Sequence, residues 1–194
     1  VGQTLCDDSR VRKLSFTGST PVGKLLMRQC ADTVKKVSLE LGGNAPFIVF
    51  DDADLDAAVT GAMASKFRNA GQTCVCTNRI YVQDAVYDAF VDKLTTAVSR
   101  LKVGDGFAEG VTIGPLINSK ATDKVKRLVS DAVSEGATLA FGGDESSQSA
   151  VEKESNFLQP SIVTDVTAEM TIANEEIFGP VATIFRFSEE ADVI

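Results

Sequence analysis

The sequence contains no histidine and no tryptophan among its 194 residues. The absence of histidine excludes Cys–His and Ser–His catalytic pairs and removes the commonest protein ligand for metal ions. No two cysteines have the Cys-x-x-Cys spacing that is typical of zinc and thioredoxin-like sites. We therefore expect no metal site, and any nucleophile in this chain needs a carboxylate as its base.

Long apolar runs are also missing, because no segment approaches the ~20 residues of a membrane span. The first residues do not form a signal peptide. The net charge of −8 argues against nucleic acid or an anionic membrane as a partner. The four cysteines, outside a secretory context, are expected to be thiols. These observations predict a protein of the cytoplasm or the mitochondrial matrix that is not secreted.

The chain begins without a methionine, and its last residues contain no signal that ends a helix or strand. We expect it to be part of a longer polypeptide, which we call the parent protein. With 44% hydrophobic residues, the chain can still bury a proper core.

Short β-rich runs alternate with longer helical patterns, which predicts an α/β fold. One helix should begin after the acidic cluster at 51–54 and end at residues 69–71, where Gly71 suits a left-handed conformation. Residues 143–156 are polar and are expected to form an exposed hairpin or loop. The expected strands are residues 13–17, 36–41, 46–50, 78–83, 138–141, 157–163 and 182–187, and the other expected helices are residues 21–31, 84–101 and 121–135.

The segment GQTCVC at residues 71–76 holds the candidate nucleophile, Cys74. A cysteine in a protein more often serves as buried packing. The position of Cys74 on a turn after a helix favours a reactive thiol instead, provided that a base is near. Glu40, in LELGG at residues 39–43, is the candidate base. Taken alone, it also fits an exposed glutamate at the end of a strand.

Two further motifs point to ligand binding. The turn GSTPVG at residues 18–23 leads into a helix, whose free N–H groups and dipole attract an anion. By itself this pattern also fits an ordinary strand-to-helix turn. The segment NEEIFGP at residues 174–180 places two carboxylates before an aromatic residue. It could hold a sugar hydroxyl, or it could be a solvated turn.

In this order, FTGS at residues 16–19, LELGG at 39–43, GQTC at 71–74 and EEIFGP at 175–180 resemble the aldehyde dehydrogenase superfamily over essentially the whole chain. The run KFRNAGQTCVC at residues 66–76 is most similar to the succinate-semialdehyde dehydrogenases. The resemblance implies a three-layer αβα catalytic domain at residues 42–194, incomplete at its C-terminus. Residues 1–41 would be the C-terminal remnant of a Rossmann-like NAD(P)-binding domain.

The resemblance also implies an activity, the NAD- or NADP-dependent oxidation of an aldehyde, with succinate semialdehyde as the expected substrate. Cys74 would form a thiohemiacetal and then a thioester, and Glu40 would activate the water that hydrolyses it. The backbone N–H of Cys74 would stabilise the developing oxyanion. The choice between NAD and NADP is not readable from these residues. Two alternatives stay open, a cofactor-free thiol esterase that uses the same pair and an isolated catalytic-domain piece without activity.

By the same resemblance, the remaining site residues fall into three groups. Arg68 would pair with the substrate carboxylate, although an arginine at a helix C-terminus is also favoured by the helix dipole. Cys76 could form a disulfide with Cys74 and so switch the enzyme off under oxidation. The parent protein would be a homodimer or homotetramer, and the present chain alone should bind cofactor poorly. The cofactor-binding residues would be Gly18, Ser19, Gly23, Leu41, Gly42, Glu176 and Phe178.

Overall fold

The computed structural model describes residues 1–143 and 156–194. The chain divides into two compact units, an N-terminal unit, Val1–Gly43, and a C-terminal unit, Asn44–Ile194. Both units combine helices with parallel strands, so the predicted α/β class is confirmed. Most of the polar segment expected at residues 143–156 lies outside the described residues.

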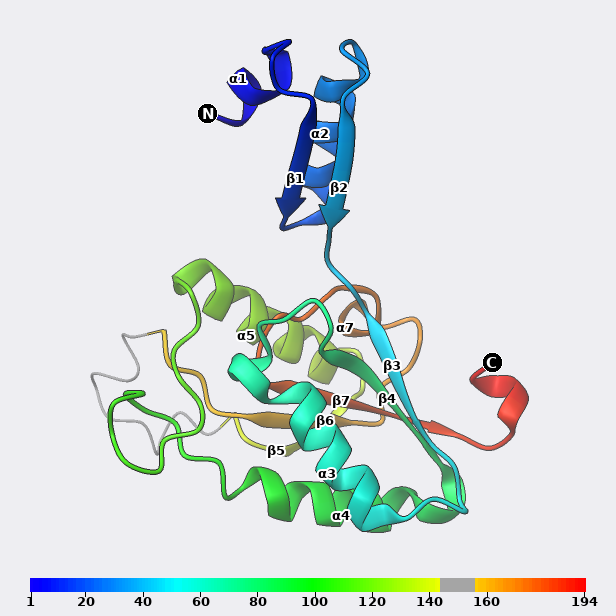
Figure 1. Ribbon diagram of the computed structural model, residues 1–194. Coiled ribbons are helices and arrows are strands. Elements are labelled where there is room, and N and C mark those ends of the chain that lie inside the picture. The colour runs from blue at the N-terminus through cyan, green and yellow to red at the C-terminus, as the bar shows by residue number, and fades with distance from the viewer. Residues whose placement is uncertain (144–155) are drawn as a thin grey trace. The chain divides into compact units, whose positions relative to one another are not determined.

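The N-terminal unit is a β–α–β unit preceded by a short helix. Strands β1 (Lys13–Thr17) and β2 (Lys36–Glu40) are parallel, and helix α2 (Thr20–Ala31) connects them. Helix α2 packs on one face of the strand pair, as Figure 1 shows. Helix α1 (Gly2–Asp7) was not expected from the sequence. The buried core of this unit consists of Cys6, Leu14, Leu26 and Cys30, with Phe16 and Val37 packed against it.

The C-terminal unit is built on a five-stranded sheet with the order β3-β4-β7-β6-β5. Neighbouring strands are parallel except for β5, which is antiparallel to β6 at one edge. Strands β6 and β7 are almost entirely buried, which agrees with the apolar residues that make up most of β7 and the centre of β6. The strands are β3 (Ala45–Val49), β4 (Thr77–Gln83), β5 (Thr138–Phe141), β6 (Ser161–Thr164) and β7 (Val181–Phe187).

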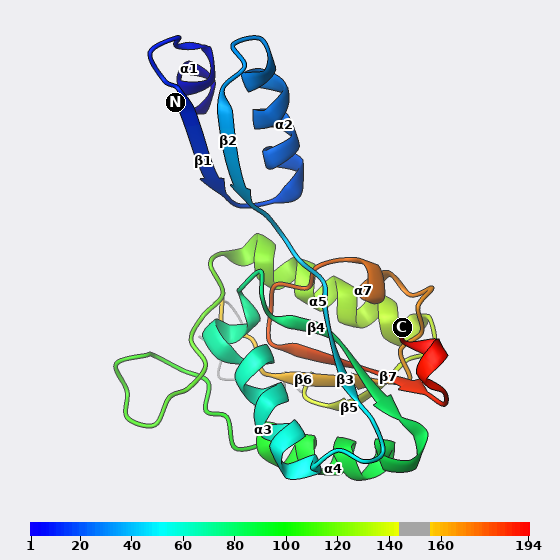
Figure 2. The same ribbon diagram turned by 45° about the vertical axis from the view of Figure 1, so that its right-hand side comes forward.

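Helices cover both faces of this sheet, as Figure 2 shows, with α3 and α4 on one face and α5 and α7 on the other. Asp54 caps α3 by accepting hydrogen bonds from the N–H groups of Asp56 and Ala57. Asn118 caps α5 in the same way. Every helix in the described part of the chain is too short or too polar to cross a membrane. The helices are α3 (Leu55–Lys66), α4 (Tyr87–Val98), α5 (Ser119–Ser134) and α7 (Thr171–Asn174).

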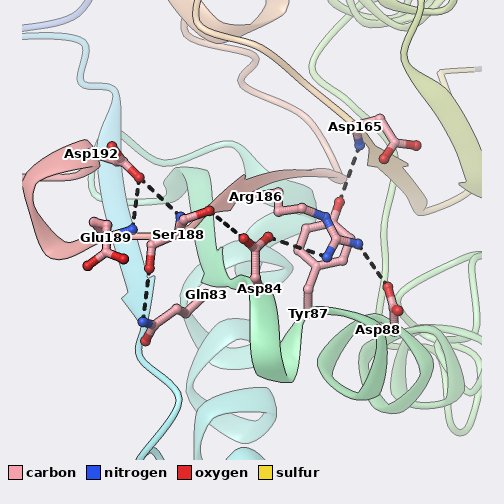
Figure 3. Close-up of polar contacts among 9 residues, drawn as sticks. All are labelled: Gln83, Asp84, Tyr87, Asp88, Asp165, Arg186, Ser188, Glu189 and Asp192. Atoms are coloured by element: carbon pink, nitrogen blue, oxygen red, sulfur yellow. Dashed lines mark hydrogen bonds and ion pairs between the residues drawn. The ribbon is translucent and has the colours of Figure 1, made fainter.

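The parallel strands of the C-terminal unit give its sheet two different edges. The cysteine segment directly precedes β4, and the segment of Glu176 directly precedes β7. Because β4 and β7 are parallel neighbours, both segments lie at the amino ends of the strands. The carboxyl ends of the same two strands carry the network of polar contacts in Figure 3. There, Arg186 forms ion pairs with Asp84 at 3.5 Å and with Asp88 at 2.9 Å.

Several expected elements differ in extent from those observed; the helix expected to end at residues 69–71, for example, ends at Lys66. The helix expected at residues 84–101 starts as a short 3₁₀ turn, η2 (Asp84–Val86), because Val86 has non-helical backbone angles, and α4 ends at Val98. The strand expected at residues 157–163 begins only at Ser161. The residue before it, Pro160, has no N–H to donate to a neighbouring strand. Strand β2 ends at Glu40, one residue before the expected end.

Candidate active site

The turn that carries Cys74 has an unusual backbone. Helix α3 ends at Lys66, and the 3₁₀ turn η1 (Arg68–Gly71) follows. Asn69, Ala70 and Gly71 have positive φ values of 52°, 54° and 74°. The left-handed conformation predicted for Gly71 is therefore confirmed. At a non-glycine residue such a conformation costs free energy, and such residues concentrate at functional sites.

Gly71 also lets two distant segments touch. A Cβ atom at position 71 would overlap the backbone carbonyl of Gly179 and would lie 3.1 Å from the nitrogen of Pro180. On its other side, a Cβ atom at Gly179 would lie 2.5 Å from Val125 of α5. The backbone before β7 is thus packed between the cysteine turn and α5, and both approaches require glycine. This packing brings the Cys74 turn and the Glu176 segment together.

Gln72 fixes the same turn to a third segment. Its Oε1 accepts a hydrogen bond of 2.9 Å from the N–H of Ile117. Its Nε2 lies 3.4 Å from the carbonyl oxygen of Pro115 and 3.3 Å from that of Asn69. The glutamine side chain therefore restrains the backbone immediately before the candidate nucleophile, a role that a turn position alone did not predict.

The two cysteines of the turn have different environments. The N–H of Cys76 donates to the carbonyl of Thr73 at 3.1 Å, so Cys74 and Val75 are the central residues of a tight turn. Cys74 is half-buried, whereas Cys76 is 2% exposed and its Sγ lies 2.7 Å from Thr73 Oγ1. Both are free thiols. Cys74 is thus the accessible thiol of the pair, and the redox role of Cys76 stays a prediction.

Arg68 lies at the start of η1 and is exposed. Its guanidinium forms no ion pair or side-chain hydrogen bond with another residue in the described part of the chain. An exposed guanidinium without a protein partner is available for bidentate bonding to an anionic group of a ligand. The structure places this arginine one short turn before Cys74, and its substrate role stays a prediction.

The segment before β7 presents its two candidate residues differently. Glu176 is half-buried, and its backbone carbonyl accepts a hydrogen bond of 2.5 Å from Lys124 Nζ of α5. Phe178 has a positive φ of 56° and is 36% exposed. Ile177, between them, is fully buried and anchors the segment in the core. The sequence analysis did not identify Lys124, because nothing in the pattern of α5 distinguishes it from a surface lysine.

Lys66 is a second residue that the sequence analysis missed. It is the last residue of α3, its side chain is 0% exposed, and its Nζ donates to Asn78 Oδ1 at 3.0 Å. Burial lowers the pKa of the Lys66 ammonium to about 8, and nearby Cys76 and Glu176 act against this decrease. A signal was available, because Lys66 stands four residues after the buried Ala62 on the apolar face of α3.

The remaining predicted site residues lie in the N-terminal unit. Glu40 ends β2 with an exposed side chain, and its carbonyl accepts a hydrogen bond of 3.0 Å from the N–H of Gly18. Ser19 is the N-cap of α2 but makes no side-chain capping hydrogen bond. The first N–H groups of α2 and the serine hydroxyl are therefore available to an anion.

Gly23 and Leu41 pack against each other next to the turn at residues 18–23. A Cβ atom at Gly23 would lie 2.6 Å from Leu41 Cδ2, so glycine allows α2 to pack closely against the end of β2. Gly42 follows Leu41 and is exposed. The N-terminal unit thus brings together Gly18, Ser19, Glu40 and Leu41. The base role of Glu40 and the cofactor roles of its neighbours stay predictions.

A metal centre is not indicated in the part of the chain that the structure describes. No group of three or more histidine, cysteine, aspartate or glutamate residues there is arranged to hold a metal ion.

Comparisons with known proteins identify the family of the chain. The model of the aldehyde dehydrogenase family matches residues 1–194. The succinate-semialdehyde dehydrogenase [NADP(+)] GabD of Escherichia coli is 61% identical over 194 residues, which are 100% of this chain and 39% of that protein. The 3-sulfolactaldehyde dehydrogenase of Pseudomonas putida is 58% identical with the same coverage. The chain thus spans about two fifths of the length of these relatives.

Solved structures give the same result. A succinate-semialdehyde dehydrogenase from Burkholderia pseudomallei has a TM-score of 0.94 and 57% identity, covering 99% of this chain and 39% of that one. A betaine aldehyde dehydrogenase from Staphylococcus aureus in complex with NAD+ has a TM-score of 0.91 and 37% identity, covering 98% and 38%.

Proposed function

The chain belongs to the aldehyde dehydrogenase family, and on this premise we propose that its parent protein oxidises an aldehyde bearing a negatively charged group, with succinate semialdehyde as the expected substrate. The observation that carries the proposal is the accessible thiol of Cys74 on a turn that Gly71 packs against the Glu176 segment. The acceptor is NAD or NADP, as in the relatives whose names or complexes include them.

The covalent steps follow from the groups on the turn. The Cys74 thiolate attacks the carbonyl carbon and forms a C–S bond, and the carbonyl oxygen becomes the oxyanion of a thiohemiacetal. The backbone N–H of Cys74 donates to this oxygen. A nicotinamide held by these residues would supply the two-electron oxidation as the hydride acceptor, and the thiohemiacetal on Cys74 would become a thioester. Glu40 takes a proton from water, and the resulting attack releases the carboxylic acid and regenerates the thiolate.

The two units divide the work in this proposal. The N-terminal unit, with its uncapped α2 and the small residues Gly18, Ser19 and Gly23, fits the pyrophosphate of a dinucleotide. Leu41 and Gly42 would lie near the nicotinamide. In the C-terminal unit, the half-buried carboxylate of Glu176 fits a ribose diol, and Phe178 projects beside it from its left-handed backbone. The N-terminal unit would then belong to the cofactor domain and the C-terminal unit to the catalytic domain.

The charge of the substrate is the part of the proposal that Arg68 supports. The relatives named above act on succinate semialdehyde and on 3-sulfolactaldehyde, and a further relative of P. putida, 59% identical, is a glutarate-semialdehyde dehydrogenase. These three aldehydes share an anionic group, either a carboxylate or a sulfonate. A guanidinium binds both classes, so the unpaired Arg68 selects for charge, and chain length is selected elsewhere.

The decisive assay uses the parent protein with a panel of aldehydes and both cofactors. Succinate semialdehyde, glutarate semialdehyde and 3-sulfolactaldehyde should be oxidised with kcat/KM well above that of butanal, a neutral aldehyde with the same number of carbons as succinate semialdehyde. Arg68→Met should reduce kcat/KM for the anionic aldehydes by at least about tenfold and leave butanal oxidation nearly unchanged. Arg100→Met, at an exposed arginine after α4, is the matched control.

Three results would contradict the proposal. Oxidation of butanal as fast as that of succinate semialdehyde would contradict the preference for an anionic substrate. Ester hydrolysis without any cofactor-dependent oxidation would favour the thiol esterase. Aldehyde oxidation by Glu40→Gln at the wild-type rate would contradict the role of Glu40 as general base, because loss of a general base is expected to lower the rate about 10²- to 10⁴-fold. We also propose that the parent protein assembles as a homodimer or homotetramer in the cytoplasm or the mitochondrial matrix.

A further inference from the structure

Asn44, the residue that directly precedes β3, carries a buried polar atom without a partner. Its side-chain Nδ2 donates a hydrogen bond of 2.8 Å to the carbonyl oxygen of Ala173 in α7. Because a carbonyl oxygen can only accept, this contact identifies the nitrogen end of the amide. The other end, Oδ1, is buried and has no hydrogen-bond partner among the described residues. A buried acceptor without a donor lowers stability, so the presence of this amide calls for an explanation.

The backbone of Asn44 is also held in place. Arg79 Nε on β4 donates a hydrogen bond of 3.0 Å to the carbonyl oxygen of Asn44. The regular pairing of β3 with β4 is interrupted next to this point, since the register shifts between Ala45 and Pro46. The arginine side chain therefore fixes the backbone where the strand pairing is irregular. Asn44 is thus a fixed point at the amino end of the sheet.

The helix that Asn44 contacts, α7, depends on the rest of the unit. It has 4 residues, whereas an isolated helix needs at least about 12–15 residues to be even marginally stable in water. At its start, the Glu135 carboxylate accepts hydrogen bonds from the N–H of Thr171 at 3.1 Å and from its hydroxyl at 3.2 Å. At its end, the Ala173 carbonyl is one of the groups that a helix leaves without an internal partner, and Asn44 supplies the donor.

The connection from α7 to Glu176 is short. The N–H of Glu175 donates to the carbonyl of Thr171 at 3.1 Å, which is the last backbone hydrogen bond of the helix, and Glu176 is the next residue. The Glu175 carboxylate also pairs with Arg127 of α5 at 3.2 Å. The contacts of α5 hold this segment on one side, and Asn44 holds it from the start of β3. A displacement of the end of α7 would therefore move Glu176.

We propose that Asn44 is a positioning residue, whose amide fixes the end of α7 and so places the Glu176 carboxylate for the ribose of the nicotinamide cofactor. This inference rests on the proposed function for the ribose, whereas the hydrogen bond between Asn44 and α7 does not. A carboxylate that is already fixed loses less conformational entropy when a diol binds, so the cofactor binds more tightly. The unpartnered Oδ1 is the loss of stability that accompanies this arrangement.

The first test follows one backbone amide in the 194-residue chain, without any assay of activity. Hydrogen–deuterium exchange at the N–H of Glu175, measured by NMR, reports the opening of α7. Asn44→Leu keeps a side chain of similar shape but removes the donor, and we expect exchange at Glu175 to become at least about tenfold faster. The same substitution removes the unpartnered oxygen, so the midpoint of unfolding in urea should stay nearly the same.

The matched control is Gln83→Met, at an amide that joins two segments at the opposite edge of the sheet. Gln83 Oε1 accepts a hydrogen bond of 2.8 Å from the N–H of Asp51. Its Nε2 donates to the carbonyl of Ser188 at 3.1 Å (Figure 3). Loss of this amide should leave exchange at Glu175 unchanged.

Two results of the exchange experiment would overturn the proposal. One is equal exchange at Glu175 in the wild type and in Asn44→Leu. The other is an equal acceleration at Val166, whose N–H bonds to the carbonyl of Ile184 in the sheet, because a general loss of stability would then explain both. If Asn44→Leu does not fold, Asn44→Ala, which introduces no larger side chain, decides by the same comparison.

The second test uses the parent protein. Asn44→Leu should raise the KM for the nicotinamide cofactor at least about fivefold with a smaller change in kcat, because Glu176 is displaced but still present. Combined with Glu176→Gln, its effect should be less than additive, and Gln83→Met should change neither constant. A lower kcat at an unchanged KM, or additive effects, would overturn the positioning role. A wild-type parent protein without aldehyde oxidation would refute the proposed function and with it the ribose, while the exchange experiment would still decide whether Asn44 fixes α7.

Discussion

The two edges of the sheet in the C-terminal unit are built on different principles. At the amino ends of β4 and β7, the backbone takes left-handed conformations, two glycines meet without room for a side chain, and a lysine is fully buried. At the carboxyl ends, exposed charges pair across the strand ends, and Arg186 lies 3.8 Å above the ring of Tyr87 (Figure 3). A left-handed residue occurs at both edges, since Asp165 after β6 has a φ of 57°, but only the amino-end edge adds the close glycine contact and the buried lysine.

The difference bears on where function is found in α/β proteins. In open parallel sheets, ligands usually bind outside the carboxyl ends of the strands. The proposed cofactor residues of the N-terminal unit would follow this rule, because the turn of Gly18 follows β1 and Glu40 ends β2. The proposed site residues of the C-terminal unit would invert it, since Cys74 and Glu176 precede their strands. In the C-terminal unit, the close approach of Gly71 and Gly179 therefore marks the proposed site, and the direction of the strands does not.

The strongest test of this contrast is the removal of the candidate nucleophile. Cys74→Ala should lower aldehyde oxidation by the parent protein at least about 10³-fold, because no other thiol can form the thioester. In the present chain, mass-spectrometric mapping of iodoacetamide labelling should find Cys74 modified first, since Cys6, Cys30 and Cys76 are at most 2% exposed. Arg186→Met, at the opposite edge, should change neither result. Faster labelling of a buried cysteine would contradict the assignment.

The next largest effect should come from the glycine contact. Gly71→Ala places a Cβ atom against the Gly179 carbonyl at a positive φ, and we expect it to reduce the free energy of unfolding by about 2–4 kcal/mol. Labelling of Cys74 should also change its rate, because the turn must move. Gly136→Ala is the matched control, since Gly136 also has a positive φ, 110°, but has no atom within 4 Å of the new methyl group. Equal losses in denaturant titrations of both variants would leave only backbone strain as the cause.

Local patterns in the sequence predicted most of the helices and strands. The strand at Lys13–Thr17 and the left-handed Gly71 follow from short-range signals, apolar alternation and helix termination, and both are confirmed. The left-handed Asn69 and Ala70 were not predicted, because neither residue type prefers positive φ strongly enough to reveal it. Helix α1 was missed because six residues give too little periodicity.

The contacts that define the site depend on tertiary structure. The meeting of Gly71 with Gly179 requires that β4 and β7 be neighbours, although the two glycines lie far apart in sequence. Resemblance identified both segments without showing that their backbones touch. Lys66 was overlooked for a different reason, because the apolar face of α3 was read from its apolar residues alone. The sequence does place a charged residue at the spacing of that face.

At the carboxyl ends, a smaller effect on stability is expected. Arg186→Met removes the ion pairs with Asp84 and Asp88 and the contact with the Tyr87 ring, and we expect a loss of about 1 kcal/mol because the charges are partly exposed. Thermal unfolding of the chain should shift down by a few degrees, and the midpoint in denaturant should fall without a change in slope. The same substitution at Arg100 should be neutral. Impaired labelling of Cys74 in Arg186→Met would show that the two edges are coupled.

The smallest expected effect tests how the carboxyl-end edge responds to acid. Hydrogen bonds from the backbone N–H groups of Glu189 and Ser188 lower the pKa of Asp192. Because the folded state then binds a proton less readily than the unfolded state, this contribution is complete above about pH 4 and is lost as the pH falls through the lowered pKa. Asp192→Asn should therefore weaken the chain at pH 7 and flatten its loss of stability between pH 5 and pH 3, measured by urea titration at each pH. The control is Asp123→Asn on the exposed side of α5. Parallel pH profiles for the wild type and Asp192→Asn would mean that water replaces these hydrogen bonds without loss of stability. The stability of the carboxyl-end edge would then come from the contacts and packing of Arg186 rather than from the Asp192 carboxylate.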